Sequence, residues 1–271
     1  MEKTSKNQKS KTLIILSPPR SSSTLLFRYL YQFAPGSKRC FHEPACPAQG
    51  HKFAEQYWHA YAEPKYFEPD YEPVHQLIMT SLRENSLTII KDMSTAFKNF
   101  TQDHLTEMQS VSDVYGVFLI RDPDESLYSV YQKCDRQLTQ GLIEFLGFRE
   151  TVEMIRMFRR QSIPHMVIRS EDFNKYPAKT IERISQMIGL EIPFVPKWAP
   201  LPADFDFYEE WHECKKPPII EQWHGEACRC TGFGGPRPVS TKIVDAKHLE
   251  LYNGFLRSMT EAYHHIIFDL K

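Results

Sequence analysis

The stretch of sequence most suited to chemistry is residues 16–24, LSPPRSSST, which follow a short apolar run and precede a helical pattern. A turn from a strand into a helix offers unpaired backbone N–H groups and the positive end of the helix dipole to an anion. Arg20 adds a forked cation. Four hydroxyl donors follow it: Ser21, Ser22, Ser23 and Thr24. We predict a phosphate site here, although a serine-rich helix cap without a ligand would have the same sequence.

This loop differs from the form that binds nucleoside triphosphates. That form, G-x-x-x-x-G-K-[ST], uses a lysine to reach the β- and γ-phosphates. Residues 16–24 contain neither glycine nor lysine. The sequence therefore favours a different phosphate ligand.

A second candidate lies in residues 117–129, VFLIRDPDESLYS. Asp122 before a proline, with Glu125 three residues later, is the pattern of a helix N-cap and its capping partner. Arg121 is then expected at the carboxyl end of the preceding strand, with Ser129 about two turns into the helix. Spacing alone does not bring Arg121 and Ser129 to one ligand. Taken singly, they are most simply a surface arginine and a helix serine.

The elements that must hold these segments alternate between strand and helix patterns. The predicted buried strands are 12–16, 87–90, 114–120 and 165–168. The predicted helices are one beginning near Ser21 and those at 74–84, 101–111, 123–135, 142–161, 177–188 and 246–264. Strands buried on both faces predict an α/β fold: a three-layer, P-loop-type, mostly parallel sheet covered by helices on both faces. Ligands of such sheets bind outside the carboxyl ends of the strands. Residues 47–73 and 190–240 are rich in aromatic residues and prolines and are predicted to be irregular binding loops or surface connections.

Length and charge narrow the class of protein. Residues 1–11, rich in lysine and in polar residues, are predicted to be a disordered basic tail. The remaining residues, 12–271, are predicted to form a single α/β domain. The balance of 33 basic against 34 acidic residues argues against a nucleic-acid partner bound by charge. The sequence has no apolar run long enough for a transmembrane helix, and no secretory pattern follows the first lysines. We expect a cytoplasmic protein.

Three of the six cysteines raise the hypothesis of a zinc site. Cys214, His224, Cys228 and Cys230 are conceivable zinc ligands. Cys228 and Cys230, however, have one residue between them, where zinc hooks usually have two to four. Reduced thiols are the better interpretation for a chain without a secretion signal, so no metal is predicted.

Taken together, the two loop segments resemble a known family. Residues 19–26, PRSSSTLL, resemble the PRSGSTLL loop of sulfotransferases that use 3′-phosphoadenosine 5′-phosphosulfate (PAPS). Residues 120–123, IRDP, with Ser129 beyond them, resemble the second element of that family, and residues 167–173, VIRSEDF, resemble a third. A weaker similarity is TGFGG at 231–235. The chain departs from the family at Ser22, where a glycine is usual and where a Cβ disfavours a positive φ.

The resemblance implies in-line transfer of a sulfuryl group from PAPS to a hydroxyl, less often an amine, of a small-molecule or carbohydrate acceptor, without a metal. It implies that Arg20 and residues 21–24 hold the 5′-phosphosulfate. It also implies that Arg121 and Ser129 hold the 3′-phosphate.

On the acceptor side, residues 41–44, FHEP, resemble the Glu-Pro segment of carbohydrate-type and bacterial sulfotransferases. Glu43 is the predicted general base, with His42 as a second candidate because its ordinary pKa suits neutral pH. Lys91 is the predicted cation for the leaving phosphate, in competition with Arg20. Without the family context, Glu43 would more simply be a solvated glutamate. For Lys91, a surface lysine is an equally good interpretation.

Two other functions compete at this point. A nucleotide-dependent kinase would need Mg²⁺ and a loop lysine, and Asp92 is its candidate metal ligand. A non-catalytic binding protein on the same scaffold is supported by Ser22 in place of glycine. Magnesium-dependent ATP binding would favour the kinase, and donor binding without turnover would favour the binding protein.

Overall fold

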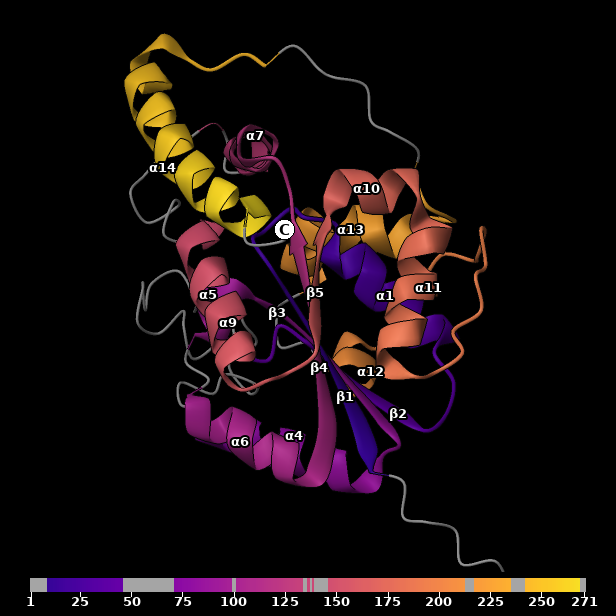
Figure 1. Ribbon diagram of the computed structural model, residues 1–271. Coiled ribbons are helices and arrows are strands. Elements are labelled where there is room, and N and C mark those ends of the chain that lie inside the picture. The colour runs from indigo at the N-terminus through magenta and orange to yellow at the C-terminus, as the bar shows by residue number, and fades with distance from the viewer. Residues whose placement is uncertain are drawn as a thin grey trace, which may run out of the picture.

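The centre of the computed structural model is a five-stranded, all-parallel sheet with the order β2-β3-β1-β4-β5 (Figure 1). The structure describes residues 9–45, 71–98, 101–133, 136, 138, 146–212, 217–234 and 242–268. The strands are β1 (Ser10–Ser17), β2 (Lys38–His42), β3 (Leu87–Met93), β4 (Ser112–Ile120) and β5 (His165–Arg169). The predicted fold class is therefore confirmed.

The inner strands form because their apolar side chains are covered on both faces. In β3 every residue is buried, and in β1 only the first two residues are partly exposed. Such continuous burial is typical of parallel sheets. Four strands were predicted at their observed places, with β1 beginning earlier, at Ser10. The edge strand β2 was not predicted, because KRCFH is short and opens with two cations.

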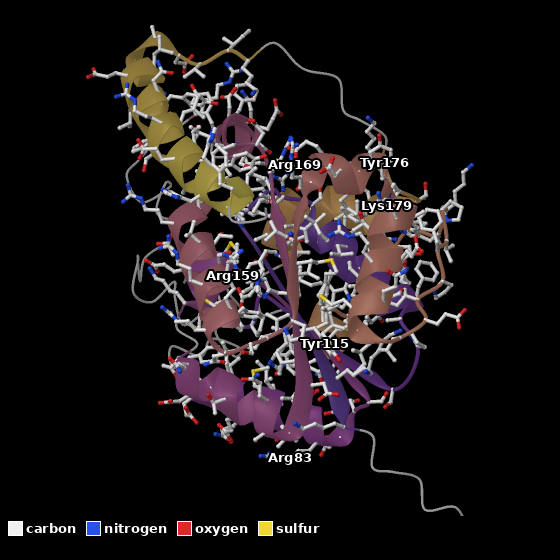
Figure 2. All side chains as sticks on the ribbon, viewed as in Figure 1. Arg83, Tyr115, Arg159, Arg169, Tyr176 and Lys179 are labelled. Carbon is white, nitrogen blue, oxygen red and sulfur yellow. The ribbon has the colours of Figure 1, made fainter. Side chains whose placement is uncertain are left out.

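Two layers of helices cover the sheet (Figure 1). One layer packs on a core that includes Ile14, Phe118 and Phe158, and the other on a core that includes Leu13, Ile15 and Trp211. The first layer contains α4 (Glu72–Glu84), α5 (Ser94–Phe97), α6 (Gln102–Val111), α7 (Pro123–Lys133), α9 (Phe148–Arg160) and α14 (Leu249–Phe268). The second contains α1 (Ser23–Phe33), α10 (Ser170–Lys175), α11 (Pro177–Ile188), α12 (Phe207–Trp211) and α13 (Pro217–Arg229). Side chains fill the space on both sides of the sheet (Figure 2).

The helix predictions differ from the structure mainly late in the chain. The predicted helix 142–161 is observed as α9 from Phe148, with residues 139–145 outside the described part. The predicted helix 246–264 begins with the short 3-10 turn Ala246–His248 and continues as α14 to Phe268. The prediction that 190–240 is irregular was wrong in part, because α12 and α13 lie within it. The prolines that open α13 suit the first turn of a helix, where a missing N–H costs nothing.

Among the described helices, none combines the length and apolar character that crossing a membrane requires. The predicted tail lies largely outside the described residues, which begin at residue 9.

Candidate functional site

The loop between β1 and α1 has two residues in the left-handed region. Arg20 has φ 66° and Ser22, the N-cap of α1, has φ 62°. An L-residue adopts this region at a cost of about 1–2 kcal/mol. Ser22 thus occupies a glycine-like conformation at the position where the resembled family usually has glycine.

Neighbouring elements hold this loop in place. Ser170 in α10 donates a hydrogen bond from Oγ to the backbone oxygen of Ser21 at 2.5 Å. Asn174, also in α10, donates from Nδ2 to Ser22 Oγ at 3.4 Å. Ser17 at the end of β1 donates from Oγ to Ser23 Oγ at 2.8 Å. Hydrogen bonds from β1 and from α10 therefore hold the loop in this conformation.

The entrance to α1 has the properties of an anion site. Within the described residues, α1 begins without a side-chain cap hydrogen bond and without an acidic residue in its first turn. Ser21 Oγ is buried, and no hydrogen-bond partner for it exists among the residues described. A buried hydroxyl without a partner costs free energy, which a bound acceptor group would recover. The residues of the loop therefore fit a phosphate or sulfonate group.

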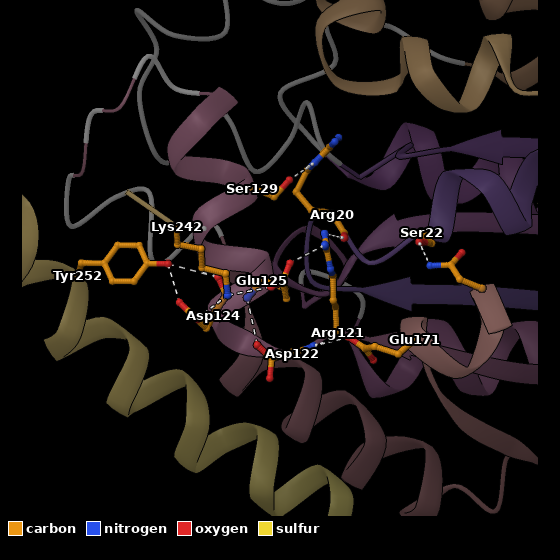
Figure 3. Close-up of polar contacts among 11 residues, drawn as sticks. Arg20, Ser22, Arg121, Asp122, Asp124, Glu125, Ser129, Glu171, Lys242 and Tyr252 are labelled. Atoms are coloured by element: carbon orange, nitrogen blue, oxygen red, sulfur yellow. Dashed lines mark hydrogen bonds and ion pairs between the residues drawn. The ribbon is translucent and has the colours of Figure 1, made fainter. Parts of the chain in front are cut away.

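The two loop segments predicted from the sequence are in direct contact (Figure 3). Arg121 Nη1 donates to the backbone oxygen of Arg20 at 3.1 Å. Arg20 Nε donates to Ser129 Oγ at 3.1 Å, and its Nη1 donates to the backbone oxygen of Trp223 at 2.7 Å. Arg121 and Ser129 thus meet at the same loop, which spacing alone did not establish. Trp223, in α13, is a contact that the sequence did not predict.

At the start of α7, a network of ion pairs lies beside Arg121 (Figure 3). Asp122 Oδ1 accepts from the Glu125 backbone N–H at 3.1 Å, which confirms the predicted N-cap. The predicted capping partner was wrong, because the Asp122 backbone N–H donates to Glu171 Oε1 at 3.0 Å and the Glu125 carboxylate pairs with Arg121. Lys242 Nζ lies 2.5 Å from Asp124 Oδ2 and 2.8 Å from Glu125 Oε1, and Arg121 Nη2 lies 3.2 Å from Glu125 Oε2. The acidic first turn suits the positive end of the helix. Arg237, which follows the TGFGG segment in the sequence, lies outside the described residues.

The predicted acid–base residues form a second, buried cluster. His42 ends β2, and its register partner in β3 is Lys91. Lys91 Nζ and Glu43 Oε1 form an ion pair in which the two side chains are 3% and 4% exposed. Glu43 has φ 55°, and its backbone N–H donates to Lys91 O at 2.5 Å. Neither a solvated glutamate nor a surface lysine describes these residues.

Asp92, the residue after Lys91 in β3, is buried next to this cluster. Its Oδ2 accepts from the Ala45 backbone N–H and its Oδ1 accepts from the Met93 backbone N–H, each at 2.8 Å. Burial, and after it the negative charge of Glu43, raises the pKa of Asp92 to about 7. Both carboxyl oxygens accept hydrogen bonds from the backbone, so Asp92 holds the turn at Glu43 in place.

Thr24, in the first turn of α1, joins the two clusters. Thr24 Oγ1 lies 3.2 Å from His42 Nε2 and 3.3 Å from His224 Nδ1. His224 Nε2 in turn lies 3.9 Å from Glu43 Oε2. The sequence offered His224 only as a conceivable zinc ligand. No local signal pointed to a place beside Glu43, because α13 comes two hundred residues after the loop.

The only described group whose donor atoms could hold a metal is His42, Glu43 and His224, with those atoms within 4.8 Å of one another. The ammonium of Lys91, already paired with Glu43, opposes a cation there. The thiols of Cys228 and Cys230 lie against the buried Arg28, and burial raises the pKa of both. Cys214 is outside the described residues, so the zinc site that the sequence left conceivable stays a hypothesis.

The fold of this chain is similar to those of several solved structures. No family model matches the chain, and no curated protein matches it. The sulfotransferase domain from the curacin biosynthetic pathway matches with a TM-score of 0.43 and 12% identity, covering 95% of this chain and 99% of that one. The mouse sulfotransferase SULT7A1 complexed with PAP matches with a TM-score of 0.44 and 8% identity over 94% of this chain and 89% of that one. The Deinococcus radiodurans tunicamycin resistance protein matches with a TM-score of 0.42 and 16% identity over 69% of this chain and 100% of that one.

Sulfotransferases thus stand among the solved structures similar to this chain, as the sequence motifs predicted. Each TM-score quoted lies below 0.5.

Proposed function

We propose that this protein is a sulfotransferase that moves a sulfuryl group from PAPS to a hydroxyl, less often an amine, of a small-molecule or carbohydrate acceptor. The observation that carries the proposal is the contact between the two motif segments. Arg121 and Ser129 both bond to Arg20, although about a hundred residues separate them from it. PAPS has phosphate at both its 5′ and its 3′ end, so it needs two sets of phosphate-binding residues at the same edge of the sheet.

The proposed donor site divides between these segments. The 5′-phosphosulfate lies at the start of α1, with Arg20, the backbone N–H groups and the hydroxyls of residues 21–24. Ser21 Oγ, buried and without a described partner, supports an acceptor group there. The 3′-phosphate lies against Arg121 and Ser129. Arg121 keeps 17% of its side chain exposed, so the side chain is not closed off from a ligand.

The proposed chemistry uses the second cluster. The acceptor oxygen attacks sulfur in line with the departing phosphate oxygen, and Glu43 or His42 takes the acceptor proton. Lys91, with Arg20, supplies the positive charge that stabilises the leaving phosphate, so the proposed reaction proceeds without a metal. The burial of Glu43 and Lys91 strengthens such electrostatic effects, because water does not screen them.

A ligand-dependent melting experiment tests the donor site. Wild type, Arg121→Ala and the control Arg160→Ala, an exposed residue of α9, are titrated with 3′-phosphoadenosine 5′-phosphate (PAP), with AMP and with Mg-ATP. At a hundred times the dissociation constant a ligand adds about 2.7 kcal/mol of stability, which raises the melting temperature by about 5–10 °C. We expect this rise with PAP in wild type and Arg160→Ala, and its loss in Arg121→Ala.

Other outcomes point elsewhere. An equal rise with Mg-ATP would favour a kinase, and no rise with any nucleotide would overturn the proposed donor site. Transfer from PAPS labelled with sulfur-35 to a panel of hydroxyl acceptors then separates an enzyme from a binding protein.

A further inference from the structure

A carboxylate stands between the two residues that are proposed to hold the 3′-phosphate. Arg121, Glu125 and Ser129 follow one another at intervals of four residues, so they lie on one side of α7 and of the turn before it. Glu125 Oε2 lies 3.2 Å from Arg121 Nη2. This carboxylate competes with a phosphate for the guanidinium and repels the negative charge of the phosphate. A phosphate can therefore bind here only if another cation balances Glu125.

Lys242 is a cation in the right place. Its Nζ lies 2.8 Å from Glu125 Oε1 and 2.5 Å from Asp124 Oδ2 (Figure 3). The two oxygens of Glu125 are thus divided between Lys242 and Arg121. Asp124 has a further partner, because Tyr252 donates from its hydroxyl to Asp124 Oδ1 at 2.7 Å. Glu125 is therefore the carboxylate whose balance depends more on Lys242.

The backbone that follows Lys242 is attached to α7 by two hydrogen bonds. The backbone N–H of Ile243 donates to the hydroxyl of Tyr128, and that of Asp245 donates to the hydroxyl of Tyr131, each at 3.3 Å. The two tyrosines are three residues apart and share one face of the helix. These contacts hold Lys242 beside the first turn of α7 without any ligand.

We propose that Lys242 neutralises Glu125 and so allows the 3′-phosphate of the donor to bind at Arg121. This inference rests on the proposed function, from which it takes the place of the 3′-phosphate. Lys242 is then a specificity-determining residue that acts through Glu125 rather than by contact with the donor. When the phosphate binds Arg121, Glu125 stays with Lys242. AMP has no 3′-phosphate, so its binding gains nothing from this pair.

Calorimetric titration with PAP and with AMP tests the role of Lys242. We expect Lys242→Met to bind PAP about tenfold more weakly than wild type, because an unbalanced carboxylate then faces the phosphate. Its affinity for AMP should stay within about twofold of wild type, because an exposed ion pair does little for the fold itself. Lys242→Arg, which keeps the charge, should recover most of the affinity for PAP. The control Lys247→Met, the same change at an exposed position in the turn before α14, should affect neither nucleotide.

A second variant separates action through Glu125 from direct contact with the phosphate. Glu125→Gln removes the negative charge and keeps the size of the side chain, so it should bind PAP at least as tightly as wild type. In the Glu125→Gln background, Lys242→Met should weaken PAP binding by less than about threefold, because the carboxylate that Lys242 balances is gone. An equal tenfold loss in both backgrounds would overturn the inference, because Lys242 would then act on the phosphate or on the fold.

The remaining outcomes separate this inference from the proposed function. If wild type prefers PAP to AMP and Lys242→Met binds PAP equally well, the inference fails and the proposed donor site stands. A loss of PAP affinity in Glu125→Gln would also overturn it, because Glu125 would then assist the phosphate. If wild type binds AMP at least as tightly as PAP, the proposed function and the inference fail together.

Discussion

At the scale of single residues, Arg20 is the residue at which the two loop segments meet. Arg20, Arg121 and Ser129 were named from two motifs, and they are in contact. The concern that Ser22 would need a positive φ is confirmed by its value of 62°. His224 could not be predicted, because its contact with Thr24 depends on how α13 packs and not on any local pattern.

Asp92 gives a pH-dependent prediction at this scale. Its carboxyl has an ordinary pKa of 3.8 and a folded-state pKa of about 7, chiefly because of burial. Between these two values the folded state holds a proton that the unfolded state has released. Rising pH therefore destabilises the fold through this group, by up to about 1.4 kcal/mol per pH unit. The stabilising effect is complete below the unfolded pKa and is lost as the pH passes the folded pKa.

The measurement is urea unfolding of wild type and Asp92→Asn at several pH values from 4 upward. Asp92→Asn loses one backbone hydrogen bond at every pH, but it has no carboxyl to titrate. The free energy of unfolding of wild type minus that of the variant should fall up to about pH 7 and then level off. A difference that is constant with pH would show that Asp92 ionises in the folded state as it does in a peptide.

At the scale of elements, α13 was not predicted from the sequence, and yet it contributes two residues to the site. The sequence around it is rich in proline and aromatic residues, which favoured a loop. The structure shows a helix that brings both Trp223 and His224 to the loop before α1. The strands were easier to predict from the sequence, because burial on both faces of the sheet requires a run of apolar residues.

The buried Arg28 of α1 holds α13 in place. Its Nη1 donates to the backbone oxygens of Ala227 and of Cys230, the latter at 2.9 Å, and its Nη2 donates to Ala199 O at 2.6 Å. Arg28→Met would leave these carbonyl groups without their donor. We expect a loss of about 3 kcal/mol in the free energy of unfolding, because a buried polar group without a partner costs about 1–3 kcal/mol.

Urea unfolding measures this loss, with Arg160→Met, at an exposed position of α9, as the control. The control should stay within about 0.5 kcal/mol of wild type. Faster amide exchange in α13 should accompany the loss in Arg28→Met. Equal stability of the two variants would mean that α13 is held by its other contacts.

At the scale of the whole molecule, three elements distant in sequence hold one loop. Helix α7 contacts it through Ser129, α10 through Ser170, and α13 through Trp223 and His224. Helix α6 makes no such contact among the interactions described, and it leads into the amino end of β4 (Figure 1). A ligand at the loop should therefore stabilise these three helices together and leave α6 as it was.

Hydrogen exchange with and without saturating PAP tests this pattern. Peptides from α1, α7, α10 and α13 should exchange more slowly with PAP, because opening any of them would release ligand contacts directly or through the loop. Peptides from α6 should be unchanged, and Arg121→Ala should abolish the protection. Protection confined to α1 would show that the loop binds PAP without engaging the helices around it, and protection that extended to α6 would indicate tightening of the whole fold instead.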